Sequence, residues 1–148
     1  MNHGQRDQED AGAGYRIVLL HAAMETSSLD YHPIMPMGLF SMAHVLHQDG
    51  HQVTILNTAV ERSHDPAWRL EHDPEILNAD LVGIDLHWYL HAWPALAAAR
   101  QVKSSRSRAT VILGGYTASV FAQEILRDHP EVDAVVQGEG ELPMMALA

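Results

Sequence analysis

The chain has 148 residues, of which 47% are hydrophobic, and this is enough for one globular domain with a buried core. It carries 19 acidic and 9 basic residues, and this balance argues against a nucleic acid or an anionic membrane surface as partner. It has no cysteine, so it can form no disulfide, no thiolate zinc site and no iron–sulfur cluster of its own.

Residues 1–14 are mostly polar or glycine and offer little to bury, so we expect a disordered N-terminal tail. This segment also lacks the apolar core of a signal peptide. Elsewhere no apolar run approaches the roughly 20 residues that a membrane helix needs. A cytoplasmic protein without a membrane partner is therefore expected.

The first half of the chain predicts two strands and one clear helix. Residues 16–20 form a run of strand length that is continuously apolar after Arg16, which is typical of a strand buried on both faces of a parallel sheet. Apolar residues then repeat at helical spacing from Leu39 to Leu46, and Gly50 is a suitable residue to end that helix. Residues 52–56 supply the second strand. The following segment is weakly patterned, and we expect only a short helix at 68–72.

The second half predicts the rest of a sheet. Strands are expected at 81–86, 110–113 and 134–137, with helices at 93–103 and 119–127 between them, and Trp93 is expected in the core. Five strands alternating with helices predict an α/β fold, a doubly wound, flavodoxin-like parallel sheet of order 2-1-3-4-5. The folded domain is expected over 15–148. Because its last helix would only just have begun at residue 148, that helix is either short or continues in a longer polypeptide.

Two glycine-rich segments follow the fourth and fifth predicted strands: Gly114-Gly115-Tyr116-Thr117 and Gly138-Glu139-Gly140. In an open parallel sheet, ligands bind outside the carboxyl ends of the strands, and a glycine there lets a flat ligand approach the backbone. The loops after strands one, three, four and five should surround that ligand. The alternative is that these glycines only close tight turns between strands and helices.

A set of short motifs in chain order carries a family resemblance. They are Pro36-Met37-Gly38-Leu39, Gly50-His51-Gln52-Val53, Ala79-Asp80-Leu81-Val82-Gly83-Ile84, Leu113-Gly114-Gly115 and Gly138-Glu139-Gly140-Glu141. Together they resemble the cobalamin-binding domain found at the N-terminus of many radical S-adenosylmethionine enzymes. The resemblance extends from Tyr15 to Ala148.

The resemblance implies a cofactor site at the strand ends. In such domains the lower face of the corrin rests on the strand ends, and the dimethylbenzimidazole tail enters a slot between the sheet and its helices. The cofactor-binding residues that the resemblance implies are Gly83, Asp85, Leu86, His87, Gly114, Gly115, Tyr116, Thr117, Ser119, Gly138, Glu139 and Gly140. Asp85 replaces the family's serine, so its charge must be solvated or paired. Thr117 and Ser119 would be hydroxyl donors, and Trp88 could pack against a corrin edge.

Histidines raise the question of metal ligation. The broader cobalamin family uses Asp-x-His-x-x-Gly after the first strand, with the histidine on cobalt. This chain has Asp30-Tyr31-His32-Pro33-Ile34-Met35, so His32 is either a cobalt ligand or a solvent-facing loop residue. Two other groups have metal-like spacing, His87 with His91, and His44 with His47 and His51. Neither has an obvious third carboxylate ligand, so no metal is expected there.

The function implied is a cobalamin-binding module that positions a corrinoid for methyl-transfer or radical chemistry. The iron–sulfur cluster and S-adenosylmethionine would lie on a missing C-terminal domain or on a partner, so catalysis by this chain alone is not expected. A receiver domain, a flavodoxin and a dinucleotide fold each lack required residues after the first or fifth strand. A flavodoxin-like interaction or signalling domain without the cofactor stays open as the alternative.

Overall fold

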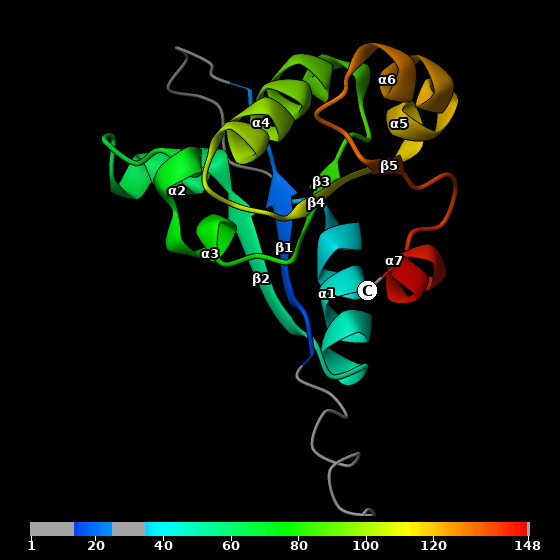
Figure 1. Cartoon of the computed structure of the whole chain (residues 1–148), viewed down its shortest axis with the longest axis horizontal. Coiled ribbons are helices and arrows are strands. Elements are labelled where there is room, and N and C mark those ends of the chain that lie inside the picture. Colours follow the sequence, from blue (N-terminus) through cyan, green and yellow to red (C-terminus); the bar gives the residue numbers. More distant parts are fainter. Residues whose placement is uncertain (1–13, 25–34, 148) are drawn as a thin grey trace, which may run out of the picture.

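The computed structural model of the chain describes residues 14–24 and 35–147. Its centre is a five-stranded parallel sheet of order β2-β1-β3-β4-β5 (Figure 1). The strands are β1 (Arg16–His21), β2 (Gln52–Asn57), β3 (Leu81–Asp85), β4 (Thr110–Gly114) and β5 (Ala134–Val135). This confirms the predicted α/β class and strand order.

Helices cover both faces of the sheet. Side chains of successive strand residues point to opposite faces, so the apolar strands β1, β3 and β4 contribute to two separate cores. One face is buried by α4 (Ala92–Ser104), η1 (Leu70–His72), α3 (Pro74–Leu77), α5 (Tyr116–Val120) and α6 (Ala122–Asp128). The other face is covered by α1 (Met37–Gln48) and α7 (Glu141–Leu147), which lie side by side in Figure 1.

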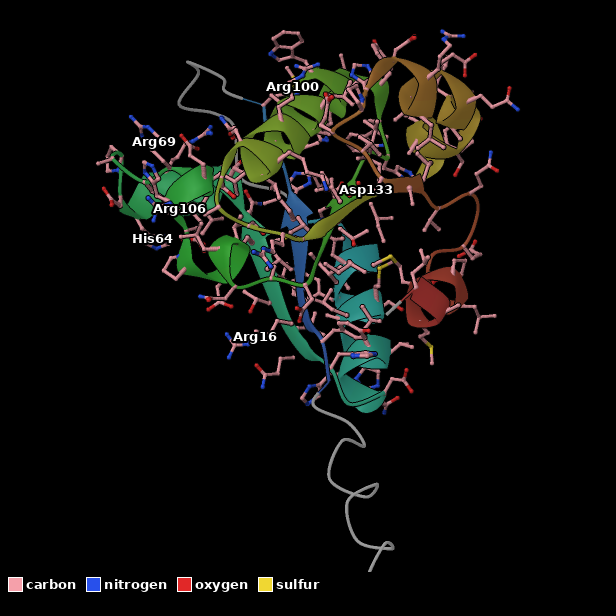
Figure 2. The ribbon with its side chains drawn as sticks, in the orientation of Figure 1. Arg16, His64, Arg69, Arg100, Arg106 and Asp133 are labelled. Atoms are coloured by element: carbon pink, nitrogen blue, oxygen red, sulfur yellow. The ribbon has the colours of Figure 1, made fainter. Side chains whose placement is uncertain are left out.

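The α4 face is closely packed. The helix presents Ala95, Ala98 and Ala99 to the strands, and all three are buried. Alanine side chains let a helix approach a sheet closely, so little space remains between them. At the edge of this face, Asp133 accepts hydrogen bonds from Lys103 Nζ and from the Val111 N–H, both at 2.6 Å (Figure 2). These bonds connect the segment before β5 to both α4 and β4.

The structure adds helices in the weakly patterned segment. Helix α2 (Thr58–His64) begins at Asn57, whose side chain accepts hydrogen bonds from the N–H groups of Ala59 and Val60. Helix α3 begins in the same way at Asp73, with Pro74 in its first turn. Both are N-terminal caps that compensate for weak hydrophobic patterning. A further short helix, η2 (Tyr89–His91), precedes α4.

Three sequence expectations were wrong in detail. The helix predicted at 119–127 is two helices, α5 and α6, separated at Phe121. Strand β5 is shorter than predicted and ends at Val135. Trp93 is not in the core: it is 75% exposed, and the Arg100 guanidinium lies 5.8 Å from its ring centroid (Figure 2 labels Arg100). A tryptophan beside an arginine is stabilised at the surface by a cation–π contact.

None of the helices in the described part of the chain combines the length and the apolar content that a bilayer crossing requires. The cytoplasmic location stays a prediction.

Candidate functional site

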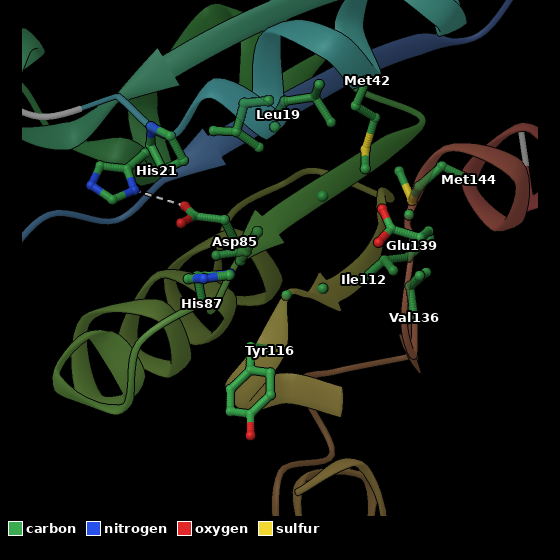
Figure 3. Close-up of a pocket in the computed structure, with 18 of the residues that line it drawn as sticks. Leu19, His21, Met42, Asp85, His87, Ile112, Tyr116, Val136, Glu139 and Met144 are labelled. Carbon is green, nitrogen blue, oxygen red and sulfur yellow. Dashed lines mark hydrogen bonds and ion pairs between the residues drawn. The ribbon is translucent and has the colours of Figure 1, made fainter. Parts of the chain in front are cut away.

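A cavity of about 870 Å³ opens at the carboxyl ends of the strands, on the face covered by α1 and α7 (Figure 3). Its walls come from β1, β3 and β4, from the loops after β3, β4 and β5, and from the two helices. The larger opening at this edge of the sheet is therefore on the face of α1 and α7, whereas a cavity of about 410 Å³ beside α4 is smaller. The larger cavity lies where the order of the strands predicts a ligand.

One part of the cavity is an apolar slot. Its walls are the side chains of Leu19, Met42, Ile112, Val136 and Met144, which face one another from the sheet and the two helices in Figure 3. Methionine side chains are flexible and adapt to irregular shapes. The slot can therefore hold a flat apolar group without a polar partner.

Glycines keep this slot open. A Cβ at Gly83, on the central strand β3, would lie 3.2 Å from Leu19 Cδ2 and 3.3 Å from Met144 Cε. A Cβ at Gly114 would meet only Val136 Cβ, at 3.9 Å, so a larger side chain there would occupy space in the cavity. Larger residues at these two positions would reduce the volume of the slot.

The other part of the cavity is polar and contains a buried pair of hydrogen-bonded side chains. His21, the last residue of β1, has its Nδ1 2.8 Å from Asp85 Oδ1, at the end of β3 (Figure 3). Only 2% of the His21 side chain and 10% of the Asp85 side chain are exposed. The Asp85 carboxyl is therefore hydrogen-bonded, as burial of a polar group requires. The other polar atom of each side chain, His21 Nε2 and Asp85 Oδ2, has no hydrogen-bond partner.

His91 completes this polar group. Its ring is buried and lies edge-on to His21, with 5.2 Å between the ring centroids. Burial lowers the pKa of His91 below its ordinary value of 6.5, and the nearby His21 lowers it further, while Asp85 acts in the opposite direction. The His91 imidazole is therefore neutral at neutral pH.

Exposed aromatic residues line the mouth of the cavity. Trp88 and Tyr116 are 55% and 69% exposed, and His87 lies between them, with ring centroids 6.3 Å and 6.4 Å away. Trp88 was expected to pack against a ligand edge, and its position at the mouth is compatible with that role. Exposed aromatic rings of this kind are available to a flat ligand.

The structure brings most of the expected site residues together. All twelve that the resemblance implied, except Leu86 and Thr117, line the cavity: Gly83, Asp85, His87, Gly114, Gly115, Tyr116, Ser119, Gly138, Glu139 and Gly140. Leu86 is buried in the core under α4. Thr117 is also buried, and its hydroxyl donates to the His87 carbonyl at 2.9 Å. These two residues support the loops of the site from behind.

Two details of the expected roles need correction. The Ser119 hydroxyl donates to the Gly115 carbonyl at 2.9 Å and accepts from the Gly138 N–H at 3.0 Å, so its proton is already used within the fold. Gly115 has φ 104°, and a Cβ there would lie 2.9 Å from the Leu86 carbonyl carbon and oxygen. The tight turn after β4 therefore requires this glycine for backbone reasons. This supports the turn-closing role of Gly115, which also lines the cavity, and its contact with a cofactor stays a prediction.

The histidine groups of the sequence analysis are not the ones that the structure assembles. His91 lies beside His21 and Asp85, whereas His87 lies at the exposed mouth of the cavity. Asp85 is thus the carboxylate that the spacing of the histidines did not reveal. His32 lies outside the described residues. The pairing register could have found His21: Leu20 pairs with Ile84 across β1 and β3, so the next residues, His21 and Asp85, are neighbours at the strand ends.

Comparison with known proteins places the chain in a family. A model of the B12 binding domain matches residues 20–148, which is most of the sequence. The chain belongs to the B12-binding domain family. The resemblance stated from the sequence is thereby confirmed, and the cavity lies where that resemblance placed the cofactor.

Individual relatives of this B12-binding domain are distant. Hopanoid C-3 methylase of Methylococcus capsulatus (strain ATCC 33009 / NCIMB 11132 / Bath) is 30% identical over 108 residues, which cover 72% of this chain and 20% of that protein. The match therefore spans only about a fifth of the methylase. A CheY-like response regulator receiver domain from Methylobacillus flagellatus aligns with a TM-score of 0.52 and 14% identity, covering 90% of this chain and 98% of the receiver. This second likeness shows the fold alone.

Proposed function

We propose that this B12-binding domain binds cobalamin in the cavity and positions it for methyl-transfer or radical chemistry on another domain or subunit. The observation that carries the proposal is the apolar slot between the sheet and helices α1 and α7, with glycines at Gly83 and Gly114 in its floor. The rest of the expected site is arranged around this slot.

The residues present fit the parts of the cofactor. The slot is apolar, which suits the flat benzimidazole tail, because burial of an apolar heterocycle there removes its surface from water. Gly138, Glu139 and Gly140 form part of the rim, where amide groups of the corrin would meet backbone groups and the Glu139 carboxylate. Exposed Trp88 and Tyr116 would cover the edges of the ring.

A bound cobalamin would supply a cobalt centre that accepts and donates a methyl group. The chain would contribute binding, orientation and exclusion of water from the lower side of the ring. His32 remains the proposed lower ligand, and its variant belongs in the same experiment.

The reaction itself would require a second protein unit. The relative is called a methylase, and most of its length lies outside the match. Because this chain has no cysteine, an iron–sulfur cluster with S-adenosylmethionine would be held by that other unit.

The test is titration of the purified chain with hydroxocobalamin, followed by absorption spectroscopy and calorimetry. The informative variant is Gly114→Leu, which would place a side chain in the cavity without a backbone clash. Its matched control is Thr110→Leu, which adds the same side chain at the exposed, opposite end of the same strand.

We expect saturable binding by the wild type and by Thr110→Leu, and loss of binding by Gly114→Leu. A His32→Ala variant should change the spectrum of the bound corrinoid if His32 is the lower ligand. A wild-type chain that is folded, as judged by circular dichroism, and binds no corrinoid would contradict the proposal and favour the cofactor-free interaction domain.

A further inference from the structure

We propose that His21, Asp85 and His91 form a binding site for a divalent transition-metal ion, such as Zn²⁺ or Co²⁺, at the polar end of the cavity. This site is additional to the corrin and does not depend on the proposed cobalamin function. One ligand atom from each of the three side chains lies within 4.8 Å of the others. An ion between them would meet two imidazoles and one carboxylate.

The fold brings the three ligands together from separate segments. His21 ends β1 and Asp85 ends the neighbouring strand β3, so the paired strands hold both side chains at one edge of the sheet. His91 comes from η2, just before α4. Residues on rigid strands and a helix start hold a fixed geometry more accurately than residues on long loops do.

The unpartnered atoms of the cluster point to a missing ligand. His21 Nε2 and Asp85 Oδ2 are buried and make no hydrogen bond. Leaving a buried polar atom without a partner is unfavourable, and such atoms usually mark a water, an ion or a functional group. Because His21 Nε2 lies on the far side of the ring from Asp85, an ion shared by the two side chains would bind the unused Asp85 Oδ2 and, in place of the present hydrogen bond, His21 Nδ1.

The donor set indicates the class of ion. Two imidazole nitrogens and one carboxylate oxygen suit Zn²⁺, Co²⁺ or Fe²⁺, whereas Ca²⁺ and Mg²⁺ prefer all-oxygen sites. With three protein ligands and a cavity on one side, a further coordination position would be open to water or to a small ligand. The ion would thus face the space in which the corrin is proposed to bind.

The site differs from the apolar slot in position and chemistry. The slot is walled by Leu19, Met42 and Met144, none of which is a ligand for these ions, whereas the cluster lies at the other end of the lining. A chain that binds Zn²⁺ but no corrinoid would support the metal site and contradict the cobalamin proposal. The failure of one proposal can therefore be distinguished from the failure of the other.

The experiment uses the full chain after removal of metals with EDTA and dialysis. Zn²⁺ is titrated by calorimetry, and Co²⁺ is titrated while visible absorption reports its coordination. The ligand variants are His91→Ala and Asp85→Asn, of which the second keeps the shape of the side chain. The control is His44→Ala, an exposed histidine of α1 outside the cavity.

We expect one tightly held ion per chain and Co²⁺ absorption bands typical of a low-coordinate site. Each ligand variant should weaken binding by more than roughly tenfold, because even the loss of outer-shell partners costs about 10- to 100-fold. His44→Ala should bind as the wild type does. If His91→Ala does not fold, the metal affinity of Asp85→Asn alone tests the site. Equal binding by the wild type, Asp85→Asn and His91→Ala would overturn the site, as would no binding by the wild type.

Discussion

The two faces of the sheet are built from the same strands but differ in how their helices pack against them. Under α4, alanines at 95, 98 and 99 belong to the same buried core as β-strand side chains such as Leu113. Under α1 and α7, methionines and glycines surround a cavity of about 870 Å³. Both faces have a buried core, but only the α1 and α7 face also leaves room for a large cavity, which is where we propose that a ligand binds.

The largest expected effect is a difference in the free energy of unfolding between two variants, one on each face. Leu113→Ala removes a fully buried side chain from the packed core and should lower the free energy of unfolding by about 3 kcal/mol. Met42→Ala removes a half-buried side chain that already borders the cavity, so the loss should be only about 1 kcal/mol. Urea unfolding of both variants measures the difference. Equal losses would show that the cavity face is as closely packed as the α4 face.

A pair of glycine variants gives the next largest effect. Gly115→Ala should destabilise the fold by about 1–3 kcal/mol, because φ is 104° and the new Cβ would meet the Leu86 carbonyl. Gly38→Ala, in the first turn of α1 with no atom within 4 Å of a new Cβ, should stabilise it by about 0.5 kcal/mol. Thermal unfolding of both variants measures these two changes in stability. A neutral Gly115→Ala would contradict the turn geometry described here.

The smallest expected effect is a dependence of stability on pH. In the folded chain the pKa of His91 is lower than its ordinary value of 6.5, which applies in the unfolded chain. Between the folded and the unfolded pKa, the unfolded chain therefore binds more protons than the folded one does. The free energy of unfolding should therefore fall as the pH drops below about 6.5, until His91 is protonated in the folded state too.

Comparison with His91→Gln isolates this contribution, since the variant keeps the other titrating groups, including His21 and Asp85. Urea unfolding at several pH values in the presence of EDTA measures it in the metal-free chain. The fall in stability should be smaller in the variant. The same pH dependence in both proteins would assign the effect to groups other than His91.

The fold and the place of the cavity were largely predictable from the sequence, for a physical reason. Strands buried on both faces are continuous apolar runs, and glycines after them mark where a strand must end abruptly, so 16–20, 81–86 and 110–113 were found close to their observed bounds. The direction of parallel strands then fixes the edge at which ligands bind. These signals are local and depend little on packing.

The parts that were missed depend on tertiary contacts or on single side chains. Helices α2 and α3 begin at the caps Asn57 and Asp73, which carry no hydrophobic periodicity. Trp93 looked like a core residue, but the alanines of the same helix occupy the inner face. The His21–Asp85 pair spans 64 residues, so only the strand register, and no motif spacing, brings it together.

Hydrogen exchange with and without hydroxocobalamin tests the division between the two faces most directly. The central claim predicts added protection in α1, in α7 and in the loops after β3, β4 and β5, and no change in α4, because those segments border the cavity and α4 does not. Protection confined to α4 and the helices beside it, or no protection at saturating cofactor, would contradict the claim that the open face binds the ligand.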